Sequence, residues 1–376
     1  MRTARRAALR RGSAACAPAS RGPRPCRAAT SAGPAGAVNG QARKPVLEVE
    51  GYNRAPVRAP QNTRLRIFSG TSHPELSREV AHYLGMPLGE IKIKKFADGE
   101  IYVQLQESVR GCDVFLIQPT CPPTNESLME LMIMIDAAKR ASARSITAVI
   151  PYYGYARADR KASGRESIAA KLTANLLTGA GCDRVLAVDL HSAQCVGYFD
   201  IPVDHVYGSS VLLDYLASKR IPAGELVVVS PDVGGVARAR AFAKKLNDAP
   251  LAIVDKRRSA HNVSEVMNLI GDVEGKVAVL VDDMIDTAGT ITNAGKVLHE
   301  NGAREVYACA THPVFSPPAI ERLSGGVFQE VIVTNTIPVA PENMFPELTV
   351  LSVANVLGET IWRVYSSASV QGLQSL

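Results

Sequence analysis

The sequence predicts an α/β fold made of two halves, each with a mostly parallel sheet flanked by helices. From Leu65 onward, short β-rich apolar runs alternate with segments whose apolar residues recur every three or four positions. This alternation is typical of parallel strands joined by crossover helices. The candidate strands number about nine, more than one small doubly wound sheet usually carries. We therefore expect two α/β halves with a boundary near Val206 to Leu213.

The candidate strands are Leu65–Phe68, Val114–Gln118, Ile146–Ile150, Arg184–Val188, Leu226–Val229, Leu251–Val254, Val277–Val281, Glu305–Ala308 and Glu330–Val333. The clearest candidate helices are Glu126–Arg140, Ser167–Thr178, Val236–Leu246 and Thr292–Glu300. Between Ile91 and Leu105, two alternating runs flank Asp98-Gly99, a pair typical of hairpin turns. We divide the chain into a leader and linker at 1–60, halves at 64–210 and 211–366, and a tail at 367–376.

The composition is that of a folded protein whose charge is unevenly distributed. Of the 376 residues, 46% are hydrophobic and 21% are charged, which suits packed domains rather than a disordered chain. The formal net charge is +6, but residues 1–47 hold nine Arg and one Lys with no Asp or Glu. Subtracting these ten charges leaves −4 for the remainder. This mildly acidic body does not predict a nucleic-acid partner.

The N-terminal segment is rich in Ala, Arg, Ser, Gly and Pro and lacks apolar periodicity. It matches an organelle transit peptide better than a secretory signal with a continuous apolar core. A plain disordered tail is the alternative. We expect processing between about Ala28 and Gln61.

Neither a membrane span nor a metal-binding cysteine motif is expected. No apolar run reaches the roughly 18 residues that a membrane helix needs, so no membrane partner is predicted. The seven Cys are scattered, and none forms a CxxC spacing. Buried thiols in a reducing compartment are therefore expected, with no disulfide.

The most informative segment is Val281 to Thr290, because an apolar strand leads into it and a helix follows. The backbone N–H groups and hydroxyls of Thr287–Thr290 can converge on a phosphate at a helix N-terminus, where the helix dipole favours an anion. The carboxylates of Asp282, Asp283 and Asp286 would be repelled by that phosphate, so they suit sugar hydroxyls or a shared cation. Together the two parts describe a pocket for a phosphorylated pentose. An acidic turn with a capping Thr is the plainer alternative.

Two further strand ends carry polar side chains, His191 and Asp232. Ligands of parallel sheets bind outside the carboxyl ends of strands. Three such ends suit a polyphosphate and Mg²⁺ site, because Mg²⁺ prefers a few carboxylate and water ligands shared with substrate phosphates. Asp232 alone could equally be a helix cap, and a histidine is an unusual Mg²⁺ ligand that could act through water.

Two basic segments remain. Asp255 to Arg258 follows a strand and opens a polar loop through Ser264. It is either a solvated surface or a mobile loop that neutralises charge on a transferring phosphoryl group. Tyr152 to Arg165 mixes aromatic and basic residues that suit adenine and phosphate contacts, although single-stranded nucleic acid would use the same types. No GxxxxGK[ST] motif is present, so any ATP site is of another type.

The Val281–Thr290 segment resembles the ribose-phosphate loop of the phosphoribosyltransferases and, more closely, that of the ribose-phosphate pyrophosphokinases, also called phosphoribosyl pyrophosphate synthetases. Similar segments recur in that family's order from about Arg66 to the C-terminal region. They are FADGE, ESVRG, YGYARADRK, VDLHSAQ, SPDVGG, DKRR and VTNTIP.

The resemblance implies two type I phosphoribosyltransferase-like domains and a ribose-phosphate diphosphokinase activity. That reaction transfers the β,γ-diphosphoryl group of ATP to the 1-hydroxyl of ribose 5-phosphate. It gives AMP and phosphoribosyl pyrophosphate for nucleotide, histidine and tryptophan biosynthesis. The implied cofactor is Mg²⁺, and inorganic phosphate is the implied activator, as in the phosphate-activated plastid and bacterial class.

The family's functional residues map onto matching positions of this sequence. The catalytic pair maps onto Lys256 and Arg258. ATP contacts map onto Phe96, Asp98, Gly99, Glu100, Arg157, Ala158 and His191. Ribose 5-phosphate contacts map onto Asp282, Asp283, Asp286, Thr287, Ala288, Gly289 and Thr290. Magnesium contacts map onto His191 and Asp232, and effector contacts onto Ser108, Arg110, Ser142 and Arg165.

The resemblance also bears on assembly, regulation and location. It implies a homohexamer built from dimers, with the hairpin around Asp98 completing an ATP site in a neighbouring subunit. Ala158 and Gly164 depart from residues common in the family, which leaves Arg157 intact but puts effector behaviour in doubt. Likeness to plastid and cyanobacterial members favours the chloroplast over the alternative, the mitochondrion.

Two rival functions share part of this pattern. A phosphoribosyltransferase that consumes phosphoribosyl pyrophosphate would have the Asp282–Thr290 loop, but not FADGE, YGYARADRK and DKRR together. A non-enzymatic relative that regulates a true synthetase would have altered catalytic segments, whereas Lys256, Arg258 and His191 are present here.

Overall fold

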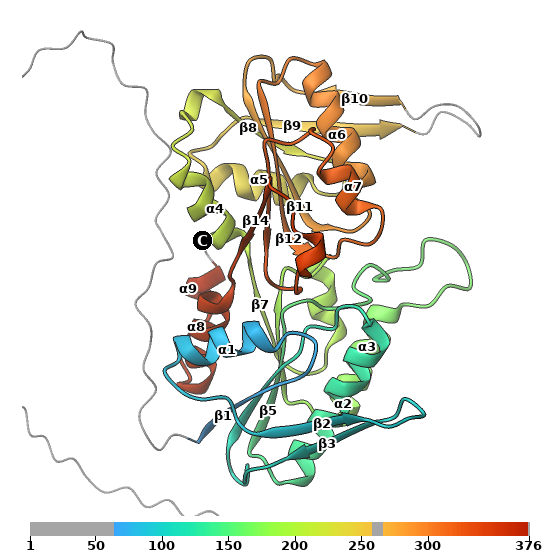
Figure 1. Cartoon of the computed structure of the whole chain (residues 1–376), viewed down its shortest axis with the longest axis vertical. Helices are drawn as coiled ribbons and strands as arrows, with labels where there is room; N and C mark the ends of the chain where they lie inside the picture. The colour runs from blue at the N-terminus through green and yellow to red at the C-terminus, as the bar shows by residue number, and fades with distance from the viewer. Residues whose placement is uncertain (1–63, 258–265, 375–376) are drawn as a thin grey trace, which may run out of the picture. The chain divides into compact units, whose positions relative to one another are not determined.

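Two mostly parallel sheets and a separate hairpin organise the protein in a computed structural model that describes residues 64–257 and 266–374 (Figure 1). The first sheet has five strands in the order β1-β4-β5-β6-β7, all parallel. Its strands are β1 (Leu65–Ser69), β4 (Asp113–Ile117), β5 (Ser145–Ile150), β6 (Arg184–Val188) and β7 (Val203–Val206).

Both faces of this sheet are covered because alternate side chains of its apolar strands enter two different clusters. Val114 and Leu116 pack with α2 (Thr124–Arg140) and α3 (Ala169–Ala180), whereas Phe115 and Ile117 pack with α1 (Pro74–Tyr83). The hairpin of β2 (Ile91–Lys95) and β3 (Ile101–Leu105) lies beside α2. Short 3-10 turns occur at Ala193–Tyr198, Ala223–Glu225 and Pro341–Asn343.

The second sheet has seven strands in the order β10-β9-β8-β11-β12-β13-β14, and only β10 runs antiparallel to its neighbour. The strands are β8 (Leu226–Ser230), β9 (Leu251–Arg257), β10 (Val266–Ile270), β11 (Val277–Ile285), β12 (Glu305–Pro313), β13 (Glu330–Thr334) and β14 (Leu348–Leu351). One face packs against α4 (Ser209–Ser218) and α5 (Val236–Lys245), and the other against α6 (Gly289–Glu300) and α7 (Ala319–Leu323).

The predicted α/β class is confirmed, and every predicted strand, helix and hairpin is present. Gly99 has a φ of 94°, which suits the Asp-Gly hairpin turn. One local prediction is wrong: Asp255 to Arg257 continue β9 instead of opening a loop, because β10 pairs with them. The sequence patterns also missed β7, β10 and β14, which are short.

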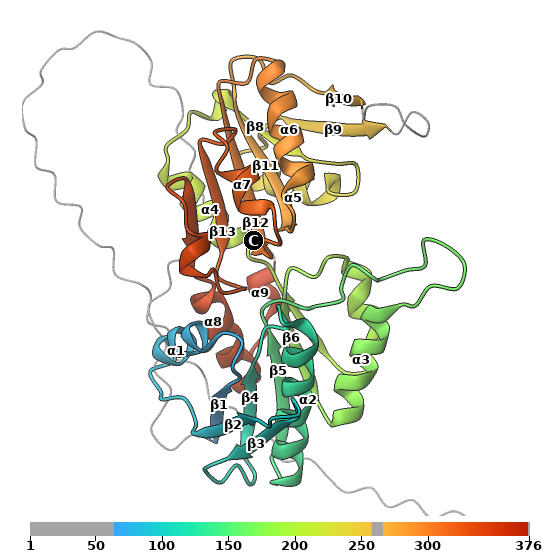
Figure 2. The same ribbon diagram turned by 45° about the vertical axis from the view of Figure 1, so that its right-hand side comes forward.

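The C-terminal segment returns to the first half. Helix α8 (Ala354–Tyr365) lies beside α1, as Figures 1 and 2 both show, and α9 (Gln371–Gln374) follows it. Leu357 and Ile361 are fully buried in one cluster with Leu65 and Leu76. The division at 210/211 stays a prediction, but the core of the first half contains residues from the end of the chain. Within the described ranges, no helix is long and apolar enough to cross a membrane.

We predict that Leu357→Ala lowers the free energy of unfolding by about 2–5 kcal/mol, because it leaves a cavity between α8 and the first sheet. Chemical denaturation of the variant and the unmodified chain measures this difference. Met344→Ala is the matched control, since Met344 is 50% exposed and its truncation should change stability by less than about 0.5 kcal/mol. Equal stability losses in both variants would contradict the packing of α8.

Candidate active site

The carboxyl ends of β6 and β11 meet through an ion pair between the two halves. His191 follows β6, and its Nδ1 lies 2.8 Å from Oδ2 of Asp283 on β11. The Asp283 side chain is only 4% exposed, whereas that of His191 is 38% exposed. The histidine therefore connects a buried carboxylate with the solvent-facing side of the site.

Asp282 and Asp283 lie within β11 and not in a turn after it, which corrects the expectation from the sequence. The strand continues to Ile285 because β12 pairs alongside it, with Asp282 opposite Ala310 and Met284 opposite His312. Pairing of Asp282 and Met284 with β12 therefore holds the backbone on both sides of Asp283.

Arg238 neutralises these two acids. Its Nη1 lies 3.0 Å from Oδ1 of Asp283 and 3.2 Å from Oδ1 of Asp282. Nη2 also donates to the backbone carbonyl of His191 at 3.5 Å. Arg238 was not among the predicted site residues. Its position in the first turn of α5 could have indicated it, because the helix dipole disfavours a cation there unless an anion is near.

The pKa values of the acids move in opposite directions because the two carboxylates share one small volume. Burial, followed by the charge of Asp283, raises the pKa of Asp282 well above its usual range. Burial also acts to raise the pKa of Asp283, but the hydrogen bond from His191 and the charge of Arg238 lower it below its usual range. The hydrogen bond that His191 donates to Asp283 raises the pKa of His191. The pair thus favours a carboxylate at Asp283 and a protonated imidazole at His191.

The candidate phosphate loop lies between β11 and α6, so the predicted strand–loop–helix order is confirmed. Ala288 has a left-handed φ of 59° and precedes the first residue of α6, Gly289. The side chains of Thr287 and Thr290 are exposed. Arg322 on α7 donates from Nη1 to the Thr287 carbonyl at 2.8 Å. Backbone N–H groups at the start of a twelve-residue helix suit an anion.

The loop is linked to the first half through Asp286. Its Oδ2 lies 2.6 Å from Nη1 of Arg157, one of the predicted ATP contacts. Burial acts to raise the pKa of Asp286, but hydrogen bonds from Ser316 and Arg157 lower it. The neighbouring residue Ala158 donates its backbone N–H to the Tyr155 carbonyl. The basic Tyr152–Arg165 segment therefore reaches the acidic loop.

Asp232 occupies the end of β8 in a tight turn. Its Oδ1 accepts from the Gly235 N–H at 2.8 Å, just before α5, and the residue is exposed. In the described residues, no group of three or more His, Cys, Asp or Glu side chains could by itself hold a metal ion. A Mg²⁺ ion that retains water and binds substrate phosphates needs only one or two protein ligands, so His191 and Asp232 fit that kind of site.

The hairpin residues form an exposed tip. Phe96 is 54% exposed and packs edge-on against Tyr102, with ring centroids 6.2 Å apart. The Glu100 N–H donates to Oδ1 of Asp98 at 3.1 Å, which fixes the turn around Gly99. An exposed aromatic ring on a rigid tip can stack on a ligand or a second subunit.

The remaining predicted residues are only partly described. Lys256 lies in β9 opposite Met267, and Arg258 lies outside the described residues. Ser108 and Arg110 are exposed, and the adjoining Gly111 N–H donates to the Ser142 carbonyl at 2.9 Å, which brings these effector candidates together. Arg165 is exposed in a different loop, with a left-handed φ of 67°.

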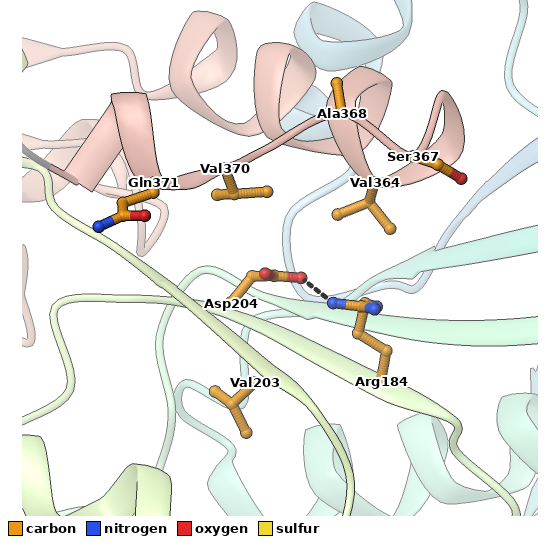
Figure 3. A pocket seen from close by; sticks show the side chains of 8 residues that line it. All are labelled: Arg184, Val203, Asp204, Val364, Ser367, Ala368, Val370 and Gln371. Carbon is orange, nitrogen blue, oxygen red and sulfur yellow. Dashed lines mark hydrogen bonds and ion pairs between the residues drawn. The ribbon is translucent and has the colours of Figure 1, made fainter.

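A separate cavity of about 500 Å³ lies between β6, β7 and the C-terminal segment (Figure 3). An ion pair of 2.7 Å joins Arg184 and Asp204 at its wall. Val364, Val370 and Gln371 close the opposite side. None of the predicted site residues lines it.

Comparisons with known proteins cover most of the chain. A family model described as the N-terminal domain of ribose phosphate pyrophosphokinase matches residues 65–181, and one described as a phosphoribosyl synthetase-associated domain matches residues 256–374. The chain is 77% identical over 312 residues to ribose-phosphate pyrophosphokinase 1 of Spinacia oleracea, which covers 83% of this chain and 93% of the relative.

Other relatives agree. Chloroplastic ribose-phosphate pyrophosphokinase 1 of Arabidopsis thaliana is 75% identical over 83% of this chain and 77% of its own length. The ribose-phosphate pyrophosphokinase of a Nostoc strain is 71% identical, over 83% and 94% respectively. The crystal structure of phosphoribosylpyrophosphate synthetase from Mycobacterium smegmatis matches with a TM-score of 0.77 and 47% identity, covering 81% of this chain and 99% of that one.

We predict that the interaction between His191 and Asp283 stabilises the fold more at pH 6 than at pH 9. The raised pKa of His191 means that its charge contributes fully below about 6.5 and is lost as the pH rises through the folded value. Asp283 stays ionised throughout, because its pKa is lowered. Unfolding free energies of His191→Gln, Asp283→Asn and the double variant give the coupling energy at each pH. A coupling energy that does not change with pH would contradict the pairing.

Proposed function

Because the chain belongs to the ribose-phosphate pyrophosphokinase family, we propose that the side chains around Asp283 form its catalytic centre. The activity of the chain is the transfer of the diphosphoryl group of ATP to ribose 5-phosphate, which gives phosphoribosyl pyrophosphate and AMP. The observation that carries the site assignment is the contact between His191 and Asp283, where the predicted metal and sugar residues of the two halves meet.

Thr287–Thr290 bind the 5-phosphate of the sugar in this proposal. The start of α6 and the exposed threonine hydroxyls support it, since both are donors for an anion. The carboxylates of Asp282, Asp283 and Asp286 accept hydrogen bonds from the ribose hydroxyls. Each already contacts an Arg or His side chain, which holds the acceptor oxygens in place.

Diphosphoryl transfer forms a bond between the sugar 1-oxygen and the β-phosphorus of ATP. The bond from that phosphorus to the oxygen bridging to the α-phosphorus breaks, and this oxygen leaves on AMP. Such a step needs in-line positioning and charge neutralisation more than covalent catalysis. Lys256 and Arg258 supply positive charge to the transferring and leaving oxygens.

Asp232 and the neutral form of His191 would hold Mg²⁺, in part through water, so metal binding would displace the Nε2 proton that His191 carries without the ion. The bound ion would neutralise charge on the triphosphate oxygens. The solvent-facing side of His191 and the exposed Asp232 support this assignment. Asp283 and Arg238 orient His191 from behind, through its ring and its carbonyl.

A second subunit completes the ATP site in this proposal. Phe96, Asp98, Gly99 and Glu100 reach ATP from a neighbouring copy, and Arg157 and Ala158 contact it from within the chain. The exposed ring of Phe96 supports an intersubunit role, as do Leu172 and Leu176, which are 56% and 41% exposed on one face of α3. We expect a homo-oligomer, specifically a hexamer built from dimers.

Regulation and location are part of the same proposal. Ser108, Arg110 and Ser142 bind inorganic phosphate as an activator, with Arg165 contributed from its own loop. The adjacency of Gly111 and Ser142 supports the first three. The names of the relatives from Arabidopsis thaliana support the chloroplast as the destination of the mature chain.

The experiment that tests the proposed site and effector is an assay of the chain beginning near Gln61. With Mg²⁺, ATP and ribose 5-phosphate, we expect AMP and phosphoribosyl pyrophosphate in equal amounts, with a higher rate when inorganic phosphate is added. Arg110→Ala should abolish the stimulation and keep the basal rate. A folded, oligomeric sample without either product would favour the regulatory relative, and stimulation that survives in Arg110→Ala would remove the effector assignment.

We also predict that Lys256→Ala lowers kcat by several powers of ten, because charge on the transferring oxygens is no longer neutralised. Steady-state kinetics and thermal unfolding of the variant separate catalysis from folding. Lys244→Ala, at an exposed lysine of α5, is the control and should behave as the unmodified enzyme. Near-native turnover of Lys256→Ala would exclude this residue from the reaction.

A further inference from the structure

The residue at the end of β6, Asp189, has an unfavourable backbone conformation that the second half holds in place. Its φ is 38°, in the left-handed region that non-glycine residues seldom adopt, although Asp tolerates it better than most. Such conformations persist where the surrounding structure fixes them, and they cluster at functional sites. The contacts of Asp189 therefore show what this turn is built to do.

Two donors fix the Asp189 side chain. Its Oδ2 accepts a hydrogen bond from Oγ1 of Thr311 on β12 at 2.5 Å and another from the Gly208 N–H at 2.9 Å. The approach is close: a Cβ on Gly208 would lie 2.8 Å from Cγ2 of Thr311 and 3.1 Å from Oδ2 of Asp189. The carboxylate is thus held between the two halves.

A buried histidine fixes the Asp189 main chain. His312, also on β12, is 1% exposed, and its Nε2 lies 3.0 Å from the Asp189 carbonyl oxygen. A carbonyl only accepts, so Nε2 carries the proton, and Nδ1 accepts from the Thr336 hydroxyl at 2.8 Å. Burial lowers the pKa of His312, which agrees with a neutral ring.

The next residue is held as well, so His191 begins from a fixed backbone. The Leu190 N–H donates to Nε2 of His205 on β7 at 3.0 Å. On the other side, His312 lies opposite Met284 in the β11–β12 register, one residue from Asp283. Strand β12 therefore holds the turn before His191 and also pairs with β11, which carries Asp283.

We propose that Asp189, Thr311 and His312 are positioning residues that set His191 against Asp283 for the reaction. This inference rests on the proposed role of His191 at the substrate phosphates. Thr311 and Gly208 hold the Asp189 carboxylate, and the turn that contains Asp189 sets the position of His191. Asp189 therefore affects catalysis only by placing His191. None of the three positioning residues needs to touch a substrate.

The test is Thr311→Val, which removes the donor to Asp189 at nearly constant volume. We expect kcat to fall by about tenfold to a hundredfold, because a shift of His191 by about 1 Å lowers the reaction rate by that order. The KM for ribose 5-phosphate should change by less than about twofold, because the substitution leaves the proposed phosphate-binding residues Thr287–Thr290 unchanged. Thr311→Ser keeps the hydroxyl and should restore most of kcat.

The control for stability is Thr360→Val. Thr360 is fully buried and donates its hydroxyl to the Val356 carbonyl at 2.7 Å within α8. We expect it to lower the thermal midpoint while leaving kcat unchanged. Thr311→Val with a kcat as high as that of Thr360→Val would overturn the inference.

His191→Gln separates this inference from the proposed function. We expect His191→Gln to lose activity and Thr311→Val to add little to that loss, because both changes disable the same group. A full additional loss in the double variant would overturn the positioning role. Full activity of His191→Gln would instead overturn the proposed site, and the inference with it.

Asp189→Gly keeps the test decisive if Thr311→Val does not fold. Glycine adopts the positive φ without strain, so this variant removes the carboxylate and relieves the backbone together. We expect it to fold and to lose kcat to a similar extent. A folded Asp189→Gly with normal kcat would overturn the inference.

Discussion

The rest of the structure depends on the ion pairs that neutralise one buried carboxylate, that of Asp283. Asp283 is 3% exposed and ionised, and burying such a charge costs several kcal/mol unless cations and donors approach it closely. Its cations, His191 and Arg238, come from the end of the first sheet and from α5. Satisfying the charge therefore fixes how the end of β6 and the start of α5 face β11.

This constraint explains how acidic side chains and the proposed phosphate-binding loop can be adjacent. The carboxylates of Asp282 and Asp286 would weaken anion binding at the start of α6 by like-charge repulsion. Ion pairs with Arg238 and Arg157 offset the negative charge of Asp282 and Asp286, respectively. The donors of the Thr287–Thr290 loop then remain available to a phosphate. In the proposed site, acceptors for the sugar hydroxyls and neutral donors for the phosphate thus lie only a few residues apart.

The sequence predicted the fold class and placed the candidate loop between a strand and a helix, because both depend on local patterns. Apolar runs and helical spacing located the strands, and the run of acids before Thr287–Thr290 located the loop. Pairing over long distances was not predictable in this way. β11 continues through Asp282 only because β12 runs beside it, and β9 continues through Arg257 only because β10 returns. Arg238 and the Thr311–Asp189 hydrogen bond likewise join residues whose proximity no local pattern encodes.

The position of α8 affects the order in which the two halves can fold during synthesis. The cluster that contains Leu65 and Leu76 is completed by Leu357, Ile361 and Leu373, so its last members are translated only after the second sheet. Until α8 has been synthesised, the part of this apolar face that α8 covers stays exposed. The first half therefore cannot complete its core before the second half has been made. Closing a loop of this length is also a slow search, during which the uncovered face is open to aggregation and to chaperones.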